Sequence, residues 1–446
     1  MKHKNMLWMM VVGLIFHFTA SAQQPETTKT LGLKEAIDLG VKNSKQLKNN
    51  KAKIAEATAA IQEAKDNRLP DVSFSGAYYF LPTNPTFGLK IKTGSDSSGG
   101  ASTPKVRQAL LGMMSASVPL YTGGKLKYGI ESAKYLEKAA ELDADHNRGA
   151  VVINTIDAFA NLYKAKAAVS LVQENLDQAH QRVVDFTNLE KNGLLARNDL
   201  LKAELTESNN ELALLDAESS YKLAYVNMDI MLGLPENTLL VPDSASLQQT
   251  GDLKPVQEYE QLALQNRKDV EALSFRKKAA ETGVKIVEAD KKPTVAASAG
   301  YVATDVPSLL YAYNVTDIGI GVKYNLSSLW KNDSKVQQAK ARKQEVDAQD
   351  DMLKDEIAMS INRDYQNYLV SKKKIDVYAK AVDQATENYK VTKNKYDNTL
   401  ATTTDLLDAD VAQLQAKLNF AFAKTDAIVA FDKLLQTVGI LESTSK

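Results

Sequence analysis

The stretch Asp317-Ile318-Gly319-Ile320-Gly321-Val322-Lys323-Tyr324-Asn325-Leu326 alternates apolar residues with polar residues or glycine throughout its length. Successive side chains of a β-strand point to opposite faces, so this pattern predicts a strand with one apolar and one polar face. A weaker alternation over residues 295–301 precedes it. We therefore predict a β-hairpin over residues 294–326.

A second alternating segment lies earlier in the chain, where Val72, Phe74 and Tyr78 alternate with Ser73 and Ser75. A Pro-, Gly- and Ser-rich stretch over 82–104 follows, and a further strand pattern runs to residue 120. This predicts a hairpin over 71–120 whose intervening stretch is typical of a mobile loop at the strand tip.

The two hairpins belong to an internal duplication. Residues 118–121 correspond to residues 324–327, and Asn192-Gly193 corresponds to Asn398-Thr399, both at an offset of 206 positions. We predict a first structural repeat at 23–255 and a second at 256–446, each with a helix, a hairpin, a long helix and another helix. Glycines and prolines between residues 233 and 255 mark a linker that ends the first repeat.

Most of the remaining sequence has helical spacing. The predicted helices cover 33–68, 122–190, 198–232, 256–291, 331–396 and 404–436. The two longest would each span roughly 100 Å at a rise of about 1.5 Å per residue. Apolar residues spaced three and four apart, as at Leu407, Val411 and Leu414, predict coiled-coil seams, for which an ordinary helical-bundle core is the alternative interpretation.

The first 22 residues have the pattern of an export signal. Lys2 and Lys4 form a basic start, residues 7–18 are mostly apolar, and Ala20-Ser21-Ala22 matches a cleavage site. No later stretch is apolar for long enough to predict a transmembrane helix. We therefore expect an exported protein that begins near Gln23.

Composition excludes several classes of function. The chain has 55 basic and 55 acidic residues and no cysteine, and only His146 and His180 remain once the predicted signal is removed. These counts exclude disulfides, thiolate metal sites and cysteine nucleophiles, and they argue against histidine-based catalysis. The balanced charge argues against a nucleic-acid partner. We expect no catalytic residue, no cofactor and no metal site, and so no enzyme.

Strands with one apolar face, in an exported chain without a spanning helix, favour an outer-membrane β-barrel. Four strands cannot leave open edges in hydrocarbon, so several chains must close the barrel. Two chains would supply 8 strands, with an interior mostly filled by side chains, whereas three would supply 12 and leave a wider lumen. The alternative is a periplasmic coiled-coil adaptor or structural trimer without a membrane barrel, which leaves the two amphipathic hairpins unexplained.

The alternation assigns the strand residues to two environments. The predicted lipid-facing residues are Phe74, Tyr78, Ile318, Ile320, Val322 and Tyr324. The predicted lumen-facing residues are Ser73, Ser75, Asp317, Gly321 and Lys323.

Three short motifs, in this order and with the duplication, resemble the TolC-like outer membrane efflux proteins along essentially the whole mature chain. The motifs are residues 31–37, Arg68-Leu69-Pro70 and Val118-Pro119-Leu120-Tyr121-Thr122-Gly123-Gly124. The resemblance implies a mainly α fold with a small β part, which assembles as a homotrimer with a 12-stranded transmembrane β-barrel and a periplasmic α-barrel. It also implies an outer-membrane exit duct of a tripartite efflux or type I secretion system, with a periplasmic adaptor and an inner-membrane pump as partners.

The resemblance further implies a gate at the periplasmic tip, where the helices turn. The family's narrowing aspartates match Asp405 and Asp408, for which helix capping is the alternative interpretation. A closed-state link of the family matches Asp199 and Tyr396, an acceptor and a phenolic donor. Simple packing of Tyr396 in a helical seam is the alternative to that link.

Overall fold

The computed structural model describes residues 27–83, 106–236, 238–243, 253–307 and 309–441. The predicted signal peptide (1–22) and residues 84–104 of the predicted loop lie outside the described residues. The chain forms two compact units. Unit 1 is built from the described parts of residues 1–47, 147–266 and 357–446, and unit 2 from those of 48–146 and 267–356.

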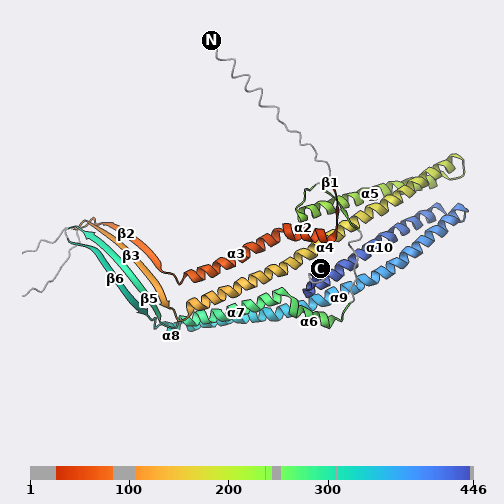
Figure 1. Ribbon diagram of the computed structural model, residues 1–446. Helices are drawn as coiled ribbons and strands as arrows, with labels where there is room; N and C mark the ends of the chain where they lie inside the picture. The colour runs from red at the N-terminus through yellow and green to blue at the C-terminus, as the bar shows by residue number, and fades with distance from the viewer. Residues whose placement is uncertain (1–26, 84–105, 237, 244–252, 308, 442–446) are drawn as a thin grey trace, which may run out of the picture. The chain divides into compact units, whose positions relative to one another are not determined.

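One order of elements occurs twice along the chain (Figure 1). The first copy comprises β1 (Thr27–Leu31), α2 (Leu33–Asn43), α3 (Lys45–Asp66), β2 (Asp71–Phe80), β3 (Gln108–Tyr121), α4 (Lys125–Lys191) and α5 (Arg197–Leu232). The second comprises β4 (Thr238–Pro242), α6 (Val256–Asn266), α7 (Lys268–Ala289), β5 (Thr294–Val306), β6 (Leu310–Lys323), the short α8 (Ser328–Lys331), α9 (Asp333–Asp397) and α10 (Thr403–Val438). Corresponding helices have almost the same length: α2 and α6 have 11 residues, α3 and α7 have 22, and α5 and α10 have 36.

Two of the predicted helices are broken, which corrects the sequence analysis. The helix predicted over 33–68 stops at Asn43 and restarts at Lys45, where the Ser44 hydroxyl accepts a hydrogen bond from the Leu47 N–H at 3.2 Å. The helix predicted over 256–291 is broken at Arg267. Helical spacing continues through both breaks, so hydrophobic periodicity did not reveal them.

The predicted linker contains a strand that the sequence analysis missed. β4 pairs in parallel with β1, from Thr27 opposite Thr238 to Leu31 opposite Pro242. Both strands have only 5 residues, too few for alternation to identify them. The boundary between the repeats, at 255/256, stays a prediction. In the structure, the second copy of the element order begins earlier, with β4.

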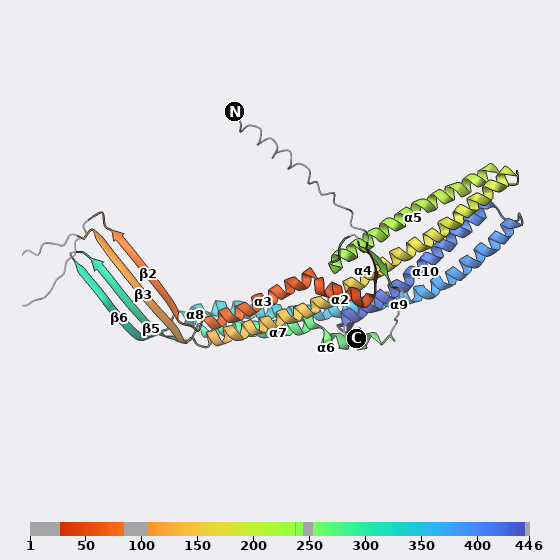
Figure 2. The same cartoon turned by 45° about the horizontal axis from the view of Figure 1, so that its top comes forward.

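Unit 1 contains two helical hairpins. The second part of α4 runs beside α5, and the second part of α9 runs beside α10 (Figures 1 and 2). One apolar core joins β1, α2, α4, α5 and β4 through Leu31, Phe159, Met228, Leu232 and Leu240. The Tyr221 hydroxyl donates to the Leu240 carbonyl at 2.6 Å inside this core.

Unit 2 contains one antiparallel sheet with the strand order β2-β3-β5-β6 (Figure 2). Each predicted hairpin forms, and the hairpins join along β3 and β5. Within the described chain, β2 and β6 have no further strand beside them. This leaves two open edges.

The helices of unit 2 pack with a small apolar cluster and several ion pairs. Ala139, Leu142 and Ala272 form the cluster. Asp143 pairs with Arg276, and Lys277 pairs with Asp347 at 2.8 Å. Among the described residues, no helix is both long enough and apolar enough to cross a membrane.

Candidate functional site

The turn between α4 and α5 closes with two backbone hydrogen bonds. The N–H of Gly193 donates to the Glu190 carbonyl, and the N–H of Leu194 donates to the Leu189 carbonyl, both at 2.9 Å. Gly193 has a φ of 73°, a left-handed conformation that glycine adopts without steric penalty. Leu194 is left 74% exposed.

The turn between α9 and α10 repeats this geometry 206 positions later. The N–H of Thr399 donates to the Tyr396 carbonyl at 2.9 Å, and the N–H of Leu400 donates to the Lys395 carbonyl at 2.8 Å. Thr399 has a φ of 64°, which is unusual for a β-branched residue. Leu400 is 76% exposed, so each turn presents one apolar side chain.

Asp405 lies in the first turn of α10 and forms a capping box with Thr402. The Asp405 N–H donates to the Thr402 hydroxyl at 3.2 Å, and the Thr402 N–H donates to the Asp405 carboxylate at 2.9 Å. The Thr402 hydroxyl also donates to this carboxylate, at 2.7 Å, and these bonds lower the pKa of Asp405. Asp408 is exposed one turn further along. In a single protomer, therefore, Asp405 caps the N-terminus of α10, as the alternative interpretation predicts.

Asp199 and Tyr396 are not joined by a hydrogen bond in the described part of the chain. The Asp199 carboxylate pairs with Lys202 at 3.4 Å, and the Lys202 ammonium donates to the Thr404 hydroxyl at 3.1 Å. The Tyr396 ring stacks on Phe186, with 5.6 Å between the ring centroids. Lys202 thus connects α5 to α10. The Tyr396 side chain is held by ring stacking and not by a hydrogen bond to Asp199.

A buried ion pair near the tip was missed by the sequence analysis. Arg182 on α4 contacts Asp410 on α10 at 2.9 Å, with side chains that are 8% and 2% exposed. Asn175 donates to the other oxygen of Asp410 at 3.3 Å, and Arg182 donates to the Tyr389 hydroxyl at 3.4 Å. Arg182 therefore links α4 to both α9 and α10.

The position of Asp410 also corrects a predicted seam. Leu407 is buried as expected, but Val411 is 56% exposed, and the buried stripe includes Asp410 and Gln413. A rule that assigns apolar residues to the inside cannot identify a stripe that contains an ion pair. The available signal was Asp410 itself, a charged residue at helical spacing from Leu406 and Thr403.

The sheet register places the predicted strand residues on two faces. Directly opposed residues of antiparallel strands share a face. Val72, Ala116, Ala299 and Ile318 form one row across the four strands, and Phe74, Tyr78, Ile320 and Val322 lie on the same face by alternation. Ile318 is 90% exposed, so this apolar face is uncovered within the chain.

The opposite face is largely polar. Ser73, Ser115, Gly300 and Asp317 form a row on it, and the hydroxyls of Ser73 and Ser115 lie 2.9 Å apart. Ser75, Gly321 and Lys323 share this face by alternation. Tyr324 follows the last residue of β6, so its placement within the strand was wrong.

Comparisons with known proteins agree with this fold. A model of the family described as outer membrane efflux protein matches residues 36–234 and 260–439. The fold is similar to that of the outer membrane protein VceC from Vibrio cholerae, at 20% identity and a TM-score of 0.72, covering 91% of this chain and 96% of that chain. No curated protein sequence matches.

Two outer-membrane channels have similar folds. CmeC of Campylobacter jejuni is 16% identical with a TM-score of 0.72, covering 92% of this chain and 86% of that chain. MtrE of Neisseria gonorrhoeae, crystallised in an open state, is 16% identical with a TM-score of 0.71, covering 92% and 89%. The proteins matched are channels rather than enzymes.

Proposed function

Because the chain belongs to the outer membrane efflux protein family and is therefore an outer-membrane efflux channel, we propose that three copies close one conduit, supplied by a periplasmic adaptor and an inner-membrane pump. The observation that carries this proposal is the sheet of unit 2, which has two open edges and an uncovered apolar face. The apolar face and the family favour a channel over the periplasmic adaptor considered as the alternative.

The open edges require other chains. Each unpaired backbone N–H or C=O group on the edges of β2 and β6 would cost several kcal/mol in hydrocarbon. Pairing β6 of one copy with β2 of the next satisfies them by symmetry. Three copies supply the 12 strands that leave an open lumen, whereas the 8 strands of two copies would leave little space.

The apolar face has the dimensions of a membrane band. On β5 it runs from Val295 to Ala303, about 27 Å of strand at roughly 3.4 Å per residue, against an apolar band of about 25 Å in such barrels. The same face then becomes polar, where the Tyr313 hydroxyl donates to Asp305 at 3.1 Å. This end of the strand suits the polar boundary of the bilayer.

The helices of unit 1 also carry a surface that fits further copies. Exposed apolar residues recur along α5 at heptad-like spacing, and they are Leu201, Leu205, Leu212, Leu215 and Leu223. Seams of this spacing pack against other helices. We assign the stripe to helices of a neighbouring copy, because the helices that contact α5 within the chain leave it exposed.

The tip turns are assigned to gating and to adaptor docking. In a trimer, Asp405 and Asp408 would place six carboxylates together, and such a ring of negative charge favours cations. Exposed Leu194 and Leu400 supply an apolar docking surface for the adaptor. The buried contact of Arg182 with Asp410 holds the two hairpins in one arrangement, and Tyr396 stabilises it by packing.

Native mass spectrometry in detergent tests the assembly and should give three protomers. Ile320→Lys should abolish insertion, since a lipid-facing lysine costs about 2–4 kcal/mol near the midplane, while Gly321→Ser on the other face should insert normally. A stable monomer with complete β-structure, or equal insertion of both variants, would contradict closure by three sheets.

Planar-bilayer recordings test the gate. Asp408→Asn is the cleaner substitution, because Asp405 also closes the capping box of α10. We expect lower cation selectivity and weaker block by multivalent cations. Thr402→Ala is the control, since it removes the cap without removing a charge; a loss of selectivity in this variant alone would assign the effect to capping.

A further inference from the structure

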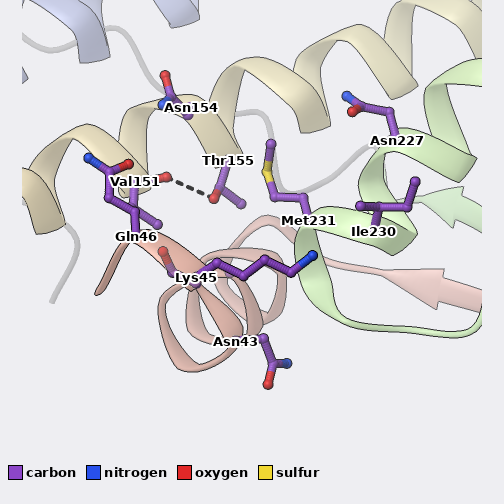
Figure 3. Close-up of a pocket in the computed structure, with 11 residues that line it drawn as sticks. Asn43, Lys45, Gln46, Val151, Asn154, Thr155, Asn227, Ile230 and Met231 are labelled. Atoms are coloured by element: carbon purple, nitrogen blue, oxygen red, sulfur yellow. Dashed lines mark hydrogen bonds between the residues drawn. The ribbon is translucent and has the colours of Figure 1, made fainter. Parts of the chain in front are cut away.

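A pocket of about 330 Å³ opens at the helix break that follows α2, and all its lining residues belong to unit 1 (Figure 3). A Cβ added to Gly40 would lie 2.7 Å from the Thr155 hydroxyl, so glycine lets α2 pack closely against α4. Ile230 and Met231 of α5 form an apolar wall, and the Lys45 side chain extends toward them (Figure 3). Ile230 is 53% exposed, so this wall faces the outside of the protomer.

The apolar stripe of α5 continues into this pocket. Ile230 lies seven residues after Leu223, the last residue of the stripe, and residues seven apart share one face of a helix. Lys45 is exposed, so none of the lining residues, all of which the structure describes, supplies a buried charge that would select a small ionic ligand. An apolar side chain from whatever packs against the stripe suits the pocket better.

A second exposed apolar stripe runs along α9. Its residues within unit 1 recur at intervals of 11, 7 and 14 residues, which return to nearly the same face of an α-helix. They are Met359, Val370, Val377 and Val391. Met359 is 69% exposed, so the described helices leave this face of α9 uncovered.

The two stripes lie on the two outer helices of unit 1. Both views show the order α5, α4, α10, α9 across the unit (Figures 1 and 2). Ion pairs join the inner two helices, Lys164 with Asp426 at 2.9 Å and Glu174 with Lys417 at 3.3 Å. A ring of identical copies brings one outer edge of each copy against the other outer edge of the next. The α5 stripe of one copy then meets the α9 stripe of its neighbour.

Contacts near the tip set the height of each residue along these helices. Leu200 on α5 packs with Phe186 in one apolar cluster, and the Tyr396 ring of α9 stacks on Phe186. Leu200 and Tyr396 therefore lie at about the same height, which rotation about an axis along the helices does not change. Because α5 and α9 run in opposite directions, Leu205 then faces Val391, each five residues from that level.

We propose that the pocket receives Met359 of the neighbouring copy, and that the two stripes form one seam between copies. Met359 lies 37 residues before Tyr396, and Val151 of the pocket lies 35 residues before Phe186, so their heights differ by only about 3 Å at about 1.5 Å per residue. The unbranched side chain of methionine adapts to irregular apolar sites. The proposal rests on the proposed function, because it needs a closed ring of copies.

Cysteine crosslinking in the detergent-solubilised trimer tests this register, because the chain has no cysteine of its own. With a short bismaleimide, Gln46→Cys with Met359→Cys should give covalent dimers and trimers, since Gln46 lines the pocket. Leu205→Cys with Val391→Cys should do the same. The matched controls exchange these cysteines: Gln46→Cys with Val391→Cys, and Leu205→Cys with Met359→Cys, differ in height by roughly 45 Å and should stay uncrosslinked. Crosslinking of the exchanged pairs, or of no pair, would overturn the register.

A charge exchange tests whether Met359 reaches Lys45. Met359→Lys brings a second ammonium group to Lys45 and should weaken the association of copies about tenfold or more in a native mass spectrometry dilution series, whereas Met359→Leu should associate like the parent. Lys45→Glu should restore the association of Met359→Lys. Lys222→Glu, on the exposed surface of α5 outside the pocket, is the matched control and should not restore it. Rescue by both changes, or by neither, would contradict the contact in the pocket.

Labelling of Met359→Cys identifies any other occupant. If a water-soluble maleimide modifies this cysteine in the conducting trimer, the pocket is open and the proposal is wrong, although the channel stands. If the cysteine is protected in cells but reactive in the purified trimer, another periplasmic component covers α9, which also overturns the proposal. Failure of the parent to form trimers would instead contradict the proposed function itself.

Discussion

The two copies of the element order agree closely at their turns and differ in their buried polar groups. At the tip, Gly193 and Thr399 make equivalent backbone hydrogen bonds although only one of them is glycine. In the helices the copies diverge: buried Asp229 on α5 corresponds to buried Leu435 on α10, and Asp410 corresponds to Glu204. Equivalent positions therefore share a backbone conformation but not a chemical role.

This difference has a physical cause. Turn geometry depends on local backbone hydrogen bonds, so any sequence that tolerates the required φ keeps it. A buried polar residue depends on partners from other helices, and those partners differ between the copies. Substitutions that exchange the residues of one copy for those of the other measure how far each role depends on its surroundings.

The largest effect is expected at the ion pair found in only one copy. Asp410→Ala leaves the Arg182 guanidinium buried without its carboxylate, which should lower the free energy of unfolding by about 3–5 kcal/mol. Glu204→Ala at the equivalent position on α5 should cost less than about 0.5 kcal/mol, since Glu204 has no ion pair among the described residues. Denaturant unfolding followed by helical circular dichroism in detergent measures both. If Asp410→Ala and Glu204→Ala lowered the free energy of unfolding by the same amount, the Arg182 guanidinium would be solvent-accessible in the Asp410→Ala variant.

A smaller effect of opposite sign is expected at Asp229. This residue is fully buried, neither carboxylate oxygen has a hydrogen-bond partner among the described residues, and burial raises its pKa to about 6. The folded state then holds the proton more tightly than the unfolded state. The resulting penalty is absent below about pH 4, grows between pH 4 and 6, and is complete above pH 6, at about 3 kcal/mol.

Asp229→Leu introduces the residue of the other copy and removes this penalty. We expect it to raise the unfolding temperature at pH 8 and to reduce the loss of stability between pH 4 and 8. The part that remains comes from Asp432, because burial raises the pKa of that carboxyl to about 6 as well. Leu435→Asp is the reciprocal variant and should create such a loss. A parent whose stability is flat over this range would show that the carboxylate is solvated.

The smallest effect is expected at the Tyr368 hydroxyl, which is buried without a partner among the described residues. Tyr368→Phe should leave the free energy of unfolding unchanged or raise it by up to about 1 kcal/mol. Tyr221→Phe is the matched control, because it deletes the hydrogen bond to the Leu240 carbonyl and should cost about 1 kcal/mol. If Tyr368→Phe and Tyr221→Phe destabilised the protein to a similar degree, an ordered water would be the hydrogen-bond partner of the Tyr368 hydroxyl.

Several features of the fold were predictable because they repeat a short-range pattern. Alternation over 317–323 gave β6 its two faces, and the 206-residue offset between Asn192 and Asn398 gave two equivalent turns. The bounds of α5, α9 and α10 were predicted to within about two residues. Ser44 and Arg267 break their helices without any proline or glycine, so the breaks were not predictable by the same means.

The sequence by itself determined the period of each segment, the duplication and the polarity of each strand face, because these depend on residues close together in the chain. Only the tertiary structure decided that Arg182 contacts Asp410, 228 positions later in the chain, and that β1 pairs with β4. It also decided that Lys45 lines a pocket, whereas Lys268 forms an ion pair with Glu271. Such contacts depend on the helix positions that the whole core sets, and an exposed and a buried charge look alike in one sequence.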